Sequence, residues 1–227
     1  MEHILENVEE IANNIAEICA KCGRNPQEIE VMGASKMNPI EPIIFLKNNG
    51  YVTTFGENRV QELLSKYDSN IVWDMIGQLQ TNKVKYIVDK VRIIQSLDRQ
   101  QLAMEIDKQA KKINKVQKVL IEINTGAEYA KGGLTFEEVL PFAETLVNYP
   151  NIKLVGVMAV APICASEDDL RALFNKVHDI FVEMQGLYSD ITVLSMGMSG
   201  DYKIAIECGS NLIRVGRTLF GARDYSK

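Results

Sequence analysis

Apolar residues recur along the chain in two alternating patterns, a helical spacing of three or four and short continuous runs. The helical spacing first covers residues 3–21, and short runs bounded by Gly, Ser, Asn or Pro then alternate with further helical segments. Runs that are apolar throughout are typical of parallel strands buried on both faces. The first helical face carries Ile4, Val8, Ile11, Ile15 and Ile18.

The pattern predicts eight strands, each followed by a helix or a turn. Asp98, Thr135 and Ser166 are predicted to cap helices, and Asp169 completes a capping box with Ser166. The predicted strands are residues 30–34, 52–55, 71–76, 91–95, 118–123, 153–157, 191–194 and 211–215. The predicted helices are residues 39–47, 58–67, 81–88, 98–113, 135–147, 166–184 and 201–207, with a last turn at 218–222.

Eight units in 227 residues correspond to roughly 28 residues each, a length that suits a βα repeat. A closed barrel and an open doubly wound sheet share this pattern. Eight units favour closure, and no G-x-G-x-x-G follows the first strand, which argues against a dinucleotide-binding sheet. We therefore predict an α/β fold, a single (β/α)8 TIM barrel domain over residues 1–227. The extra helix at residues 3–21 is expected to cover one barrel end.

Composition narrows the functional classes. Hydrophobic residues make up 46% and the net charge is −5, which indicates a globular chain and argues against nucleic-acid binding. Cys19 and Cys22 form a C-x-x-C within the first helix, without a second cysteine pair or histidine at zinc spacing, so reduced thiols are expected. There is no signal-peptide pattern, and the longest apolar run, residues 154–162, is too short for a membrane span. These features predict a cytoplasmic protein without membrane contact.

Candidate chemistry stands where the predicted strands end, because barrel active sites are built there. Lys36 ends the first strand and is expected to be partly desolvated at the barrel mouth. Desolvation lowers the pKa of a lysine amine and makes it a nucleophile for a carbonyl compound, as in a Schiff base. An ordinary solvated lysine on the rim is the alternative.

The loops after the last two strands predict a phosphate site. Ser199 and Thr218 each stand two residues after a glycine and precede a helical turn, so their hydroxyls and the nearby N–H groups can bind an anion. A reactive lysine beside a phosphate site favours an aldehyde that carries a phosphate, and pyridoxal 5′-phosphate (PLP) fits. Arg214 would then face the pyridine nitrogen and leave it neutral, since arginine cannot accept a proton. A salt bridge on the rim is the alternative for Arg214.

Motifs along almost the whole chain resemble those of the pyridoxal phosphate homeostasis protein family, the single-domain relatives of the alanine racemase barrel. The resemblance implies a PLP Schiff base on Lys36, phosphate contacts at Ser199, Gly216, Arg217 and Thr218, a further cofactor contact at Asn58, and Arg214 at the ring nitrogen. No catalytic residue and no metal ligand is implied. The motifs are Ser35-Lys36, Phe55-Gly56-Glu57-Asn58, Ile76-Gly77-Gln78-Leu79-Gln80-Thr81-Asn82-Lys83, Ser195-Met196-Gly197-Met198-Ser199 and Arg214-Val215-Gly216-Arg217-Thr218.

Three positions depart from the family pattern, since Asp74, Gln78 and Gln95 stand where histidine is frequent. None of them is a predicted cofactor contact. Lys83 and Lys131 match the pattern near the mouth. We consider anion attraction or a second PLP site for these two lysines, with plain solvation as the alternative.

Three functions compete. The first is a PLP carrier for cofactor homeostasis with little or no turnover, which hands PLP to apo PLP enzymes. The second is a PLP-dependent amino-acid racemase, but only about a dozen residues follow the last strand, too few for the added domain that supplies a second base in racemases of this barrel. The third is a Schiff-base aldolase, whose lysine usually lies on the sixth strand, where this chain has Met158. The resemblance favours the carrier and suggests a monomer.

Overall fold

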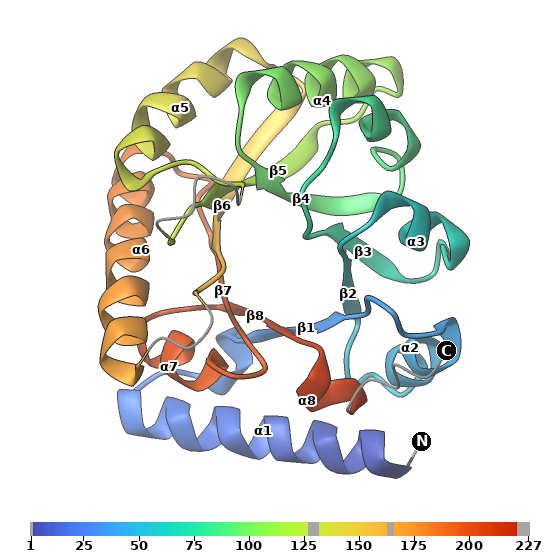
Figure 1. The fold of residues 1–227 in the computed structure, drawn as a ribbon, viewed down its shortest axis with the longest axis vertical. Helices are drawn as coiled ribbons and strands as arrows, with labels where there is room; N and C mark the ends of the chain where they lie inside the picture. The colour runs from blue at the N-terminus through green and yellow to red at the C-terminus, as the bar shows by residue number, and fades with distance from the viewer. Residues whose placement is uncertain (1, 127–131, 163–165, 222–227) are drawn as a thin grey trace.

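A closed barrel of eight parallel strands in chain order forms the centre of the computed structural model, which describes residues 2–126, 132–162 and 166–221 (Figure 1). The last strand returns to pair with the first, which confirms the predicted (β/α)8 barrel. The strands are β1 (Glu30–Ala34), β2 (Thr54–Glu57), β3 (Val72–Met75), β4 (Val91–Leu97), β5 (Gln117–Ile123), β6 (Ile152–Ala159), β7 (Val193–Met198) and β8 (Leu212–Val215).

Helices surround the barrel and largely follow the predicted segments. The α-helices are α1 (Glu2–Cys22), α2 (Ile40–Asn48), α3 (Val60–Ser65), α4 (Gln100–Lys112), α5 (Val139–Thr145), α6 (Glu167–Leu187), α7 (Tyr202–Glu207) and α8 (Arg217–Phe220). Short 3₁₀-helices are η1 (Pro26–Glu28), η2 (Thr81–Tyr86), η3 (Phe136–Glu138) and η4 (Leu146–Asn148). The helix predicted at residues 81–88 is therefore a shorter 3₁₀-helix.

Two of the three predicted helix caps are present. The Ser166 hydroxyl oxygen accepts from the Asp169 backbone N–H at 3.1 Å, and the Glu138 carboxylate accepts from the Thr135 N–H at 2.9 Å. The prediction for Asp98 is wrong. Strand β4 continues to Leu97, α4 begins only at Gln100, and the Asp98 carboxylate instead pairs with the neighbouring Arg99 guanidinium.

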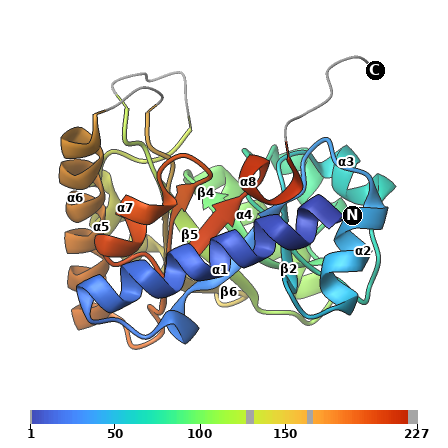
Figure 2. The same cartoon turned by 90° about the horizontal axis from the view of Figure 1, so that it is seen from below.

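Helix α1 packs along the outer wall of the barrel, so the expectation that it covers a barrel end is wrong. It lies beside α7 and α8 in both views (Figures 1 and 2). The Asn7 amide donates to the Leu219 carbonyl at 3.0 Å, and the Asn14 amide donates to the Tyr202 hydroxyl at 3.0 Å. Helix α1 therefore links the start of the chain to α7 and α8, the helices of the last two βα units.

The carboxyl ends of β2 and β7 extend further than predicted. Both strands continue through polar residues, Glu57 in β2 and Ser195 in β7, which are fully buried. Period-two alternation places Gln95, Glu122 and Ser195 on the inward side of their strands, two residues beyond an apolar inner cluster. A polar layer thus lies between that cluster and the barrel mouth, and its members need partners inside the barrel. The apolar cluster contains Ile93, Leu120, Val155 and Met158.

Candidate functional site

Three of the predicted site segments meet at one part of the rim, because β8 pairs with both β1 and β7. Arg214 of β8 lies opposite Met32 of β1 on one side and Met198 of β7 on the other. The chain after each of these strands carries Lys36, Ser199 or Gly216. Residues separated by about 180 positions therefore share one end of the barrel.

Ser199 joins the loops that follow β7 and β8. Its hydroxyl oxygen accepts from the backbone N–H groups of Gly216 and Thr218, both at 3.2 Å. The Thr218 hydroxyl donates back to the Ser199 carbonyl at 3.4 Å. Two N–H groups thus converge on one acceptor position at the rim, as in backbone anion sites. Arg217, the first residue of α8, is exposed beside them.

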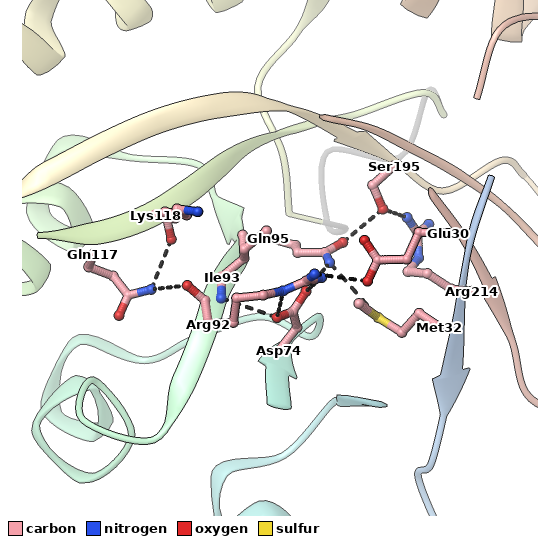
Figure 3. Close-up of polar contacts among 10 residues, drawn as sticks. All are labelled: Glu30, Met32, Asp74, Arg92, Ile93, Gln95, Gln117, Lys118, Ser195 and Arg214. Carbon is pink, nitrogen blue, oxygen red and sulfur yellow. Dashed lines mark hydrogen bonds and ion pairs between the residues drawn. The ribbon is translucent and has the colours of Figure 1, made fainter. Parts of the chain in front are cut away.

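Arg214 points into the barrel interior and is only 3% exposed (Figure 3). Its guanidinium donates to the Ser195 hydroxyl oxygen and, at 2.8 Å, to the Ala159 carbonyl. Burial lowers the pKa of Arg214 to about 10, against the opposing effect of the Glu122 and Asp201 carboxylates. The guanidinium therefore stays charged at neutral pH.

A chain of hydrogen bonds continues from Arg214 across the barrel (Figure 3). The Ser195 hydroxyl donates to Gln95 Oε1 at 2.8 Å, and Gln95 Nε2 donates to Asp74 Oδ2 at 2.8 Å. The Arg92 guanidinium binds Asp74 through two nitrogens, at 3.0 and 2.8 Å, and also pairs with Glu30 at 2.8 Å. We call the set Glu30, Arg92, Asp74, Gln95, Ser195 and Arg214 the interior relay.

Asp74 sets the direction of this relay. Burial raises the pKa of Asp74, and the Arg92 guanidinium opposes that rise. All its contacts in the relay, and the Ile93 N–H at 3.1 Å, are donors, as an ionised carboxylate requires. The Gln95 amide must then turn its nitrogen to Asp74 and its oxygen to Ser195, which leaves the Ser195 oxygen to accept from Arg214.

In the sequence, Asp74 and Gln95 stand out only as departures from a family pattern, and their hydrogen-bonded connection is not predicted. Both residues are fully buried, on neighbouring strands β3 and β4. The available signal was the presence of polar residues at inward positions of adjacent apolar strands. Such residues must pair with each other, because an unpaired buried polar group is costly.

The other predicted residues near the mouth lie at the ends of β1 and β2. Lys36 is half-buried in the turn after β1, where its carbonyl accepts from the Asn38 amide at 3.2 Å. Asn58 follows β2 directly, and a Cβ on Gly77 would lie 2.3 Å from the Asn58 carbonyl oxygen. Only glycine at position 77 therefore lets the chain after β3 pack this closely against Asn58.

Four buried side-chain oxygens at this end lack a hydrogen-bond partner among the described residues. They are Glu57 Oε2, Asn58 Oδ1, Ser96 Oγ and Glu122 Oε2. Burial and, to a lesser extent, the nearby Asp98 raise the pKa of Glu122 to about 7, against the opposing effect of Arg214. Buried acceptors without donors are typical of a site that receives a polar ligand.

Lys83 and Lys131 are the two further lysines that match the family pattern near the mouth. Lys83 lies in η2, with its ammonium 5.8 Å from the centre of the Tyr86 ring, on the helical layer outside the strands. This contact favours a surface role over direct membership of the mouth. Lys131 lies outside the described residues.

Comparison with known proteins supplies the family. The family model described as the alanine racemase N-terminal domain matches residues 7–224. The pyridoxal phosphate homeostasis protein of Aquifex aeolicus is 43% identical over 225 residues, which cover 97% of this chain and 98% of that protein. The chain belongs to the pyridoxal phosphate homeostasis protein family.

Solved structures agree with this family's barrel. PipY of Synechococcus elongatus, whose structure is described with PLP bound, superposes with a TM-score of 0.77 at 27% identity, over 91% of this chain and all of that chain. An alanine racemase of Clostridium difficile superposes with a TM-score of 0.74 at 16% identity, over 98% of this chain but only 58% of that chain. The homeostasis protein family and the racemase thus share the barrel fold.

Over residues 2–126, 132–162 and 166–221 of this homeostasis-family protein, no helix combines the length and the apolar character that crossing a membrane needs.

Glu122 should make the stability of the protein pH-dependent. Its folded pKa of about 7 lies above the ordinary value of 4.5, so the native state binds more protons than the unfolded chain between these pH values. The stabilisation is complete below that window and is lost as pH rises through it, on the order of 3 kcal/mol in all. Glu122→Gln should flatten this decline in the free energy of unfolding, measured by denaturant titration from about pH 5 to about pH 8. Glu183→Gln, at an exposed position of α6, should leave the decline intact, and an unchanged slope in Glu122→Gln would contradict the assignment.

Proposed function

We propose that the barrel mouth binds PLP, holds it covalently as a Schiff base on Lys36, and serves the homeostasis of this cofactor with little or no turnover. The observation that carries the proposal is the meeting of three features at one rim. They are the half-buried Lys36, the Ser199 junction with the N–H groups of Gly216 and Thr218, and the buried Arg214. The names of the full-length relatives and the PLP-bound relative support this choice of ligand.

The donor set of the mouth fits a phosphorylated aldehyde. The N–H groups of Gly216 and Thr218 converge on an oxygen already, so phosphate oxygens suit them, and the exposed Arg217 adds positive charge. The unpartnered Asn58 Oδ1 suits a hydroxyl of the ligand. PLP would supply an aldehyde, and the Lys36 amine would hold it through a C=N bond, with the aldehyde oxygen released as water.

Arg214 is the reason to expect little turnover. It remains charged at neutral pH and has only hydrogen-bond donors. It therefore cannot accept a hydrogen bond from a protonated pyridine nitrogen, and the neutral form of the nitrogen is favoured. A neutral pyridine ring withdraws electrons weakly and stabilises a carbanion poorly. In addition, Asp74 and Gln95 are fully buried and bonded to each other, so neither is available as an acid or base at the mouth.

The cellular setting follows from the same proposal. We place the protein in the cytoplasm as a monomer, with apo PLP enzymes as recipients of the cofactor. Cys19, Cys22 and Cys208 are free thiols, and burial raises the pKa of Cys19 and Cys208, which disfavours their reactive thiolate forms. Unpaired cysteines suit a reducing compartment.

Lys36 should carry the covalent cofactor. Borohydride reduction of the PLP-loaded protein followed by peptide mass mapping should place the label on Lys36. Lys36→Ala should lose the label and the visible absorption of the Schiff base, whereas Lys83→Ala should keep both. A label found only on Lys83 or Lys131 would overturn the assignment.

The Ser199 junction should hold the phosphate. Ser199→Ala and Thr218→Val each remove a hydrogen bond to a charged group, worth about 1.5–3 kcal/mol or roughly ten- to a hundredfold in affinity. Equilibrium dialysis of PLP against each variant measures the loss. Ser65→Ala, which removes an exposed hydroxyl on α3, should bind like the wild type. Unchanged affinity in the Ser199→Ala/Thr218→Val double variant would refute the phosphate site.

The rate of proton exchange and racemisation at the Cα atom of an added amino acid distinguishes a PLP carrier from a racemase. In deuterated water with alanine and other common amino acids, the PLP-loaded protein should show no racemisation and little Cα exchange beyond a control of free PLP. The reason is the weak electron withdrawal beside Arg214. Exchange or racemisation on the order of 1 s⁻¹ or faster, as in ordinary enzymes, would favour the racemase. This outcome is independent of whether the Schiff base forms.

A further inference from the structure

The ammonium of Lys66 lies beneath the turn that carries Lys36. Lys66 Nζ donates to the carbonyls of Ser35 and Asn38, both at 2.9 Å, and these carbonyls flank Lys36 on either side. The Lys66 side chain is only 7% exposed. A charged amine so far removed from water must be held by a full set of acceptors.

Two carboxylates complete this set. Glu57 lies 2.6 Å and Glu62 3.1 Å from Lys66 Nζ. Glu57 is fully buried, and its Oε1 also accepts from the Ser35 hydroxyl at 2.6 Å. The Glu62 carboxylate also accepts from the Met37 N–H. The residues immediately before and after Lys36 are therefore both bonded to carboxylates that Lys66 holds in place.

The turn itself needs such support. The Asn38 N–H donates to the Ser35 carbonyl at 3.0 Å, which makes Lys36 and Met37 the central residues of a four-residue turn. Met37 has φ of 62°, in the left-handed region that a residue with a side chain rarely adopts. The residue is 64% exposed, so packing does not hold it in this conformation. Strained backbone of this kind persists only where its surroundings determine it, and here these are Lys66 and its carboxylates.

We propose that Lys66 is a positioning residue for Lys36, since its ammonium fixes the backbone from which the reactive amine extends. This role rests on the proposed covalent attachment of PLP to Lys36. It predicts that the rate of covalent attachment and the affinity of non-covalent PLP binding change independently. Without Lys66 the turn relaxes and covalent attachment slows. Non-covalent binding at Ser199 and Thr218 stays the same, because these residues bond to each other and to Gly216 and not to the turn that Lys66 holds.

The test compares a variant without the buried charge pair with a matched lysine elsewhere. Lys66→Met alone would leave Glu57 buried without a counter-charge, so the test variant is Glu57→Gln/Lys66→Met. Lys115→Met is the control. Lys115 is half-buried and, like Lys66, donates to two carbonyls, those of Val88 and Val91 at 2.7 Å, but it precedes β5 at the other end of the barrel.

Two measurements are made on each protein. The first is the rate at which saturating PLP becomes fixed to Lys36, trapped with borohydride at timed intervals and read by peptide mass. The second is the affinity for PLP in a Lys36→Ala background, where only non-covalent binding remains. We expect the double variant to lose about tenfold or more in the first rate, because small misplacements of a reacting group are costly, and less than about twofold in affinity. Lys115→Met should match the wild type in both.

If the double variant does not fold, Lys66→Arg tests the same point. Its planar guanidinium keeps the charge but cannot place one centre among four acceptors, so the rate should again fall while the affinity holds. A wild-type rate in a folded variant, an equal loss in Lys115→Met, or a loss of affinity as large as the loss of rate would each overturn the role of Lys66. A wild-type protein that takes no label at Lys36 would refute the proposed function itself, and the role of Lys66 with it.

Discussion

The pairing of β8 with β1 is the constraint on which the candidate site depends. It closes the barrel and places Arg214 beside Met32, so that the chain after β1 and the chain after β8 leave the sheet side by side. Lys36 and Thr218 then belong to one rim, although most of the sequence lies between them. An open sheet with the same eight strands would put β1 and β8 at opposite edges unless its strand order changed. The site is thus a consequence of closure and not of local sequence.

Closure also creates a problem that the interior relay solves. A barrel of this size is filled by side chains, and a charge placed among them loses its water. Arg214 is almost fully buried, and its direct partners, Ser195 and Ala159, are neutral. The relay connects it to the paired charges of Asp74 and Arg92, with Gln95 as the neutral link. The orientation of the guanidinium at the mouth therefore depends on residues deep in the barrel.

Elements whose structure is determined by burial alone can be predicted from the sequence. Strand β1 has the predicted bounds, Glu30–Ala34, because a short run that is uncharged after its first residue has few alternatives in a βα repeat. The predicted ends of β2 and β7 lie too early in the sequence, because these strands continue through the polar residues Glu57 and Ser195. Their burial is possible only because of Lys66 in one case and Gln95 with Arg214 in the other.

The candidate site, like the fold, can be predicted from the sequence only in part. The meeting of Ser199 with Gly216 and Thr218 could be predicted, because it follows from a known corner of the barrel. The importance of Lys66 could not, since nothing in its sequence neighbourhood distinguishes it from a solvated helix-terminal lysine. Its four acceptors are two carbonyls of the turn after β1, Glu57 of β2 and Glu62 of α3, and only the folded chain brings them together.

The interior relay has a consequence for how this protein can change over generations. The amide of Gln95 is oriented by Asp74, and Asp74 is held by Arg92, so the three side chains form one hydrogen-bonding unit spread over β3 and β4. Replacing any one of them leaves a buried donor or acceptor without a partner. The loss in the free energy of unfolding is about 1–3 kcal/mol, or more for a charged group. Viable lineages must therefore alter these positions together or through neutral intermediates.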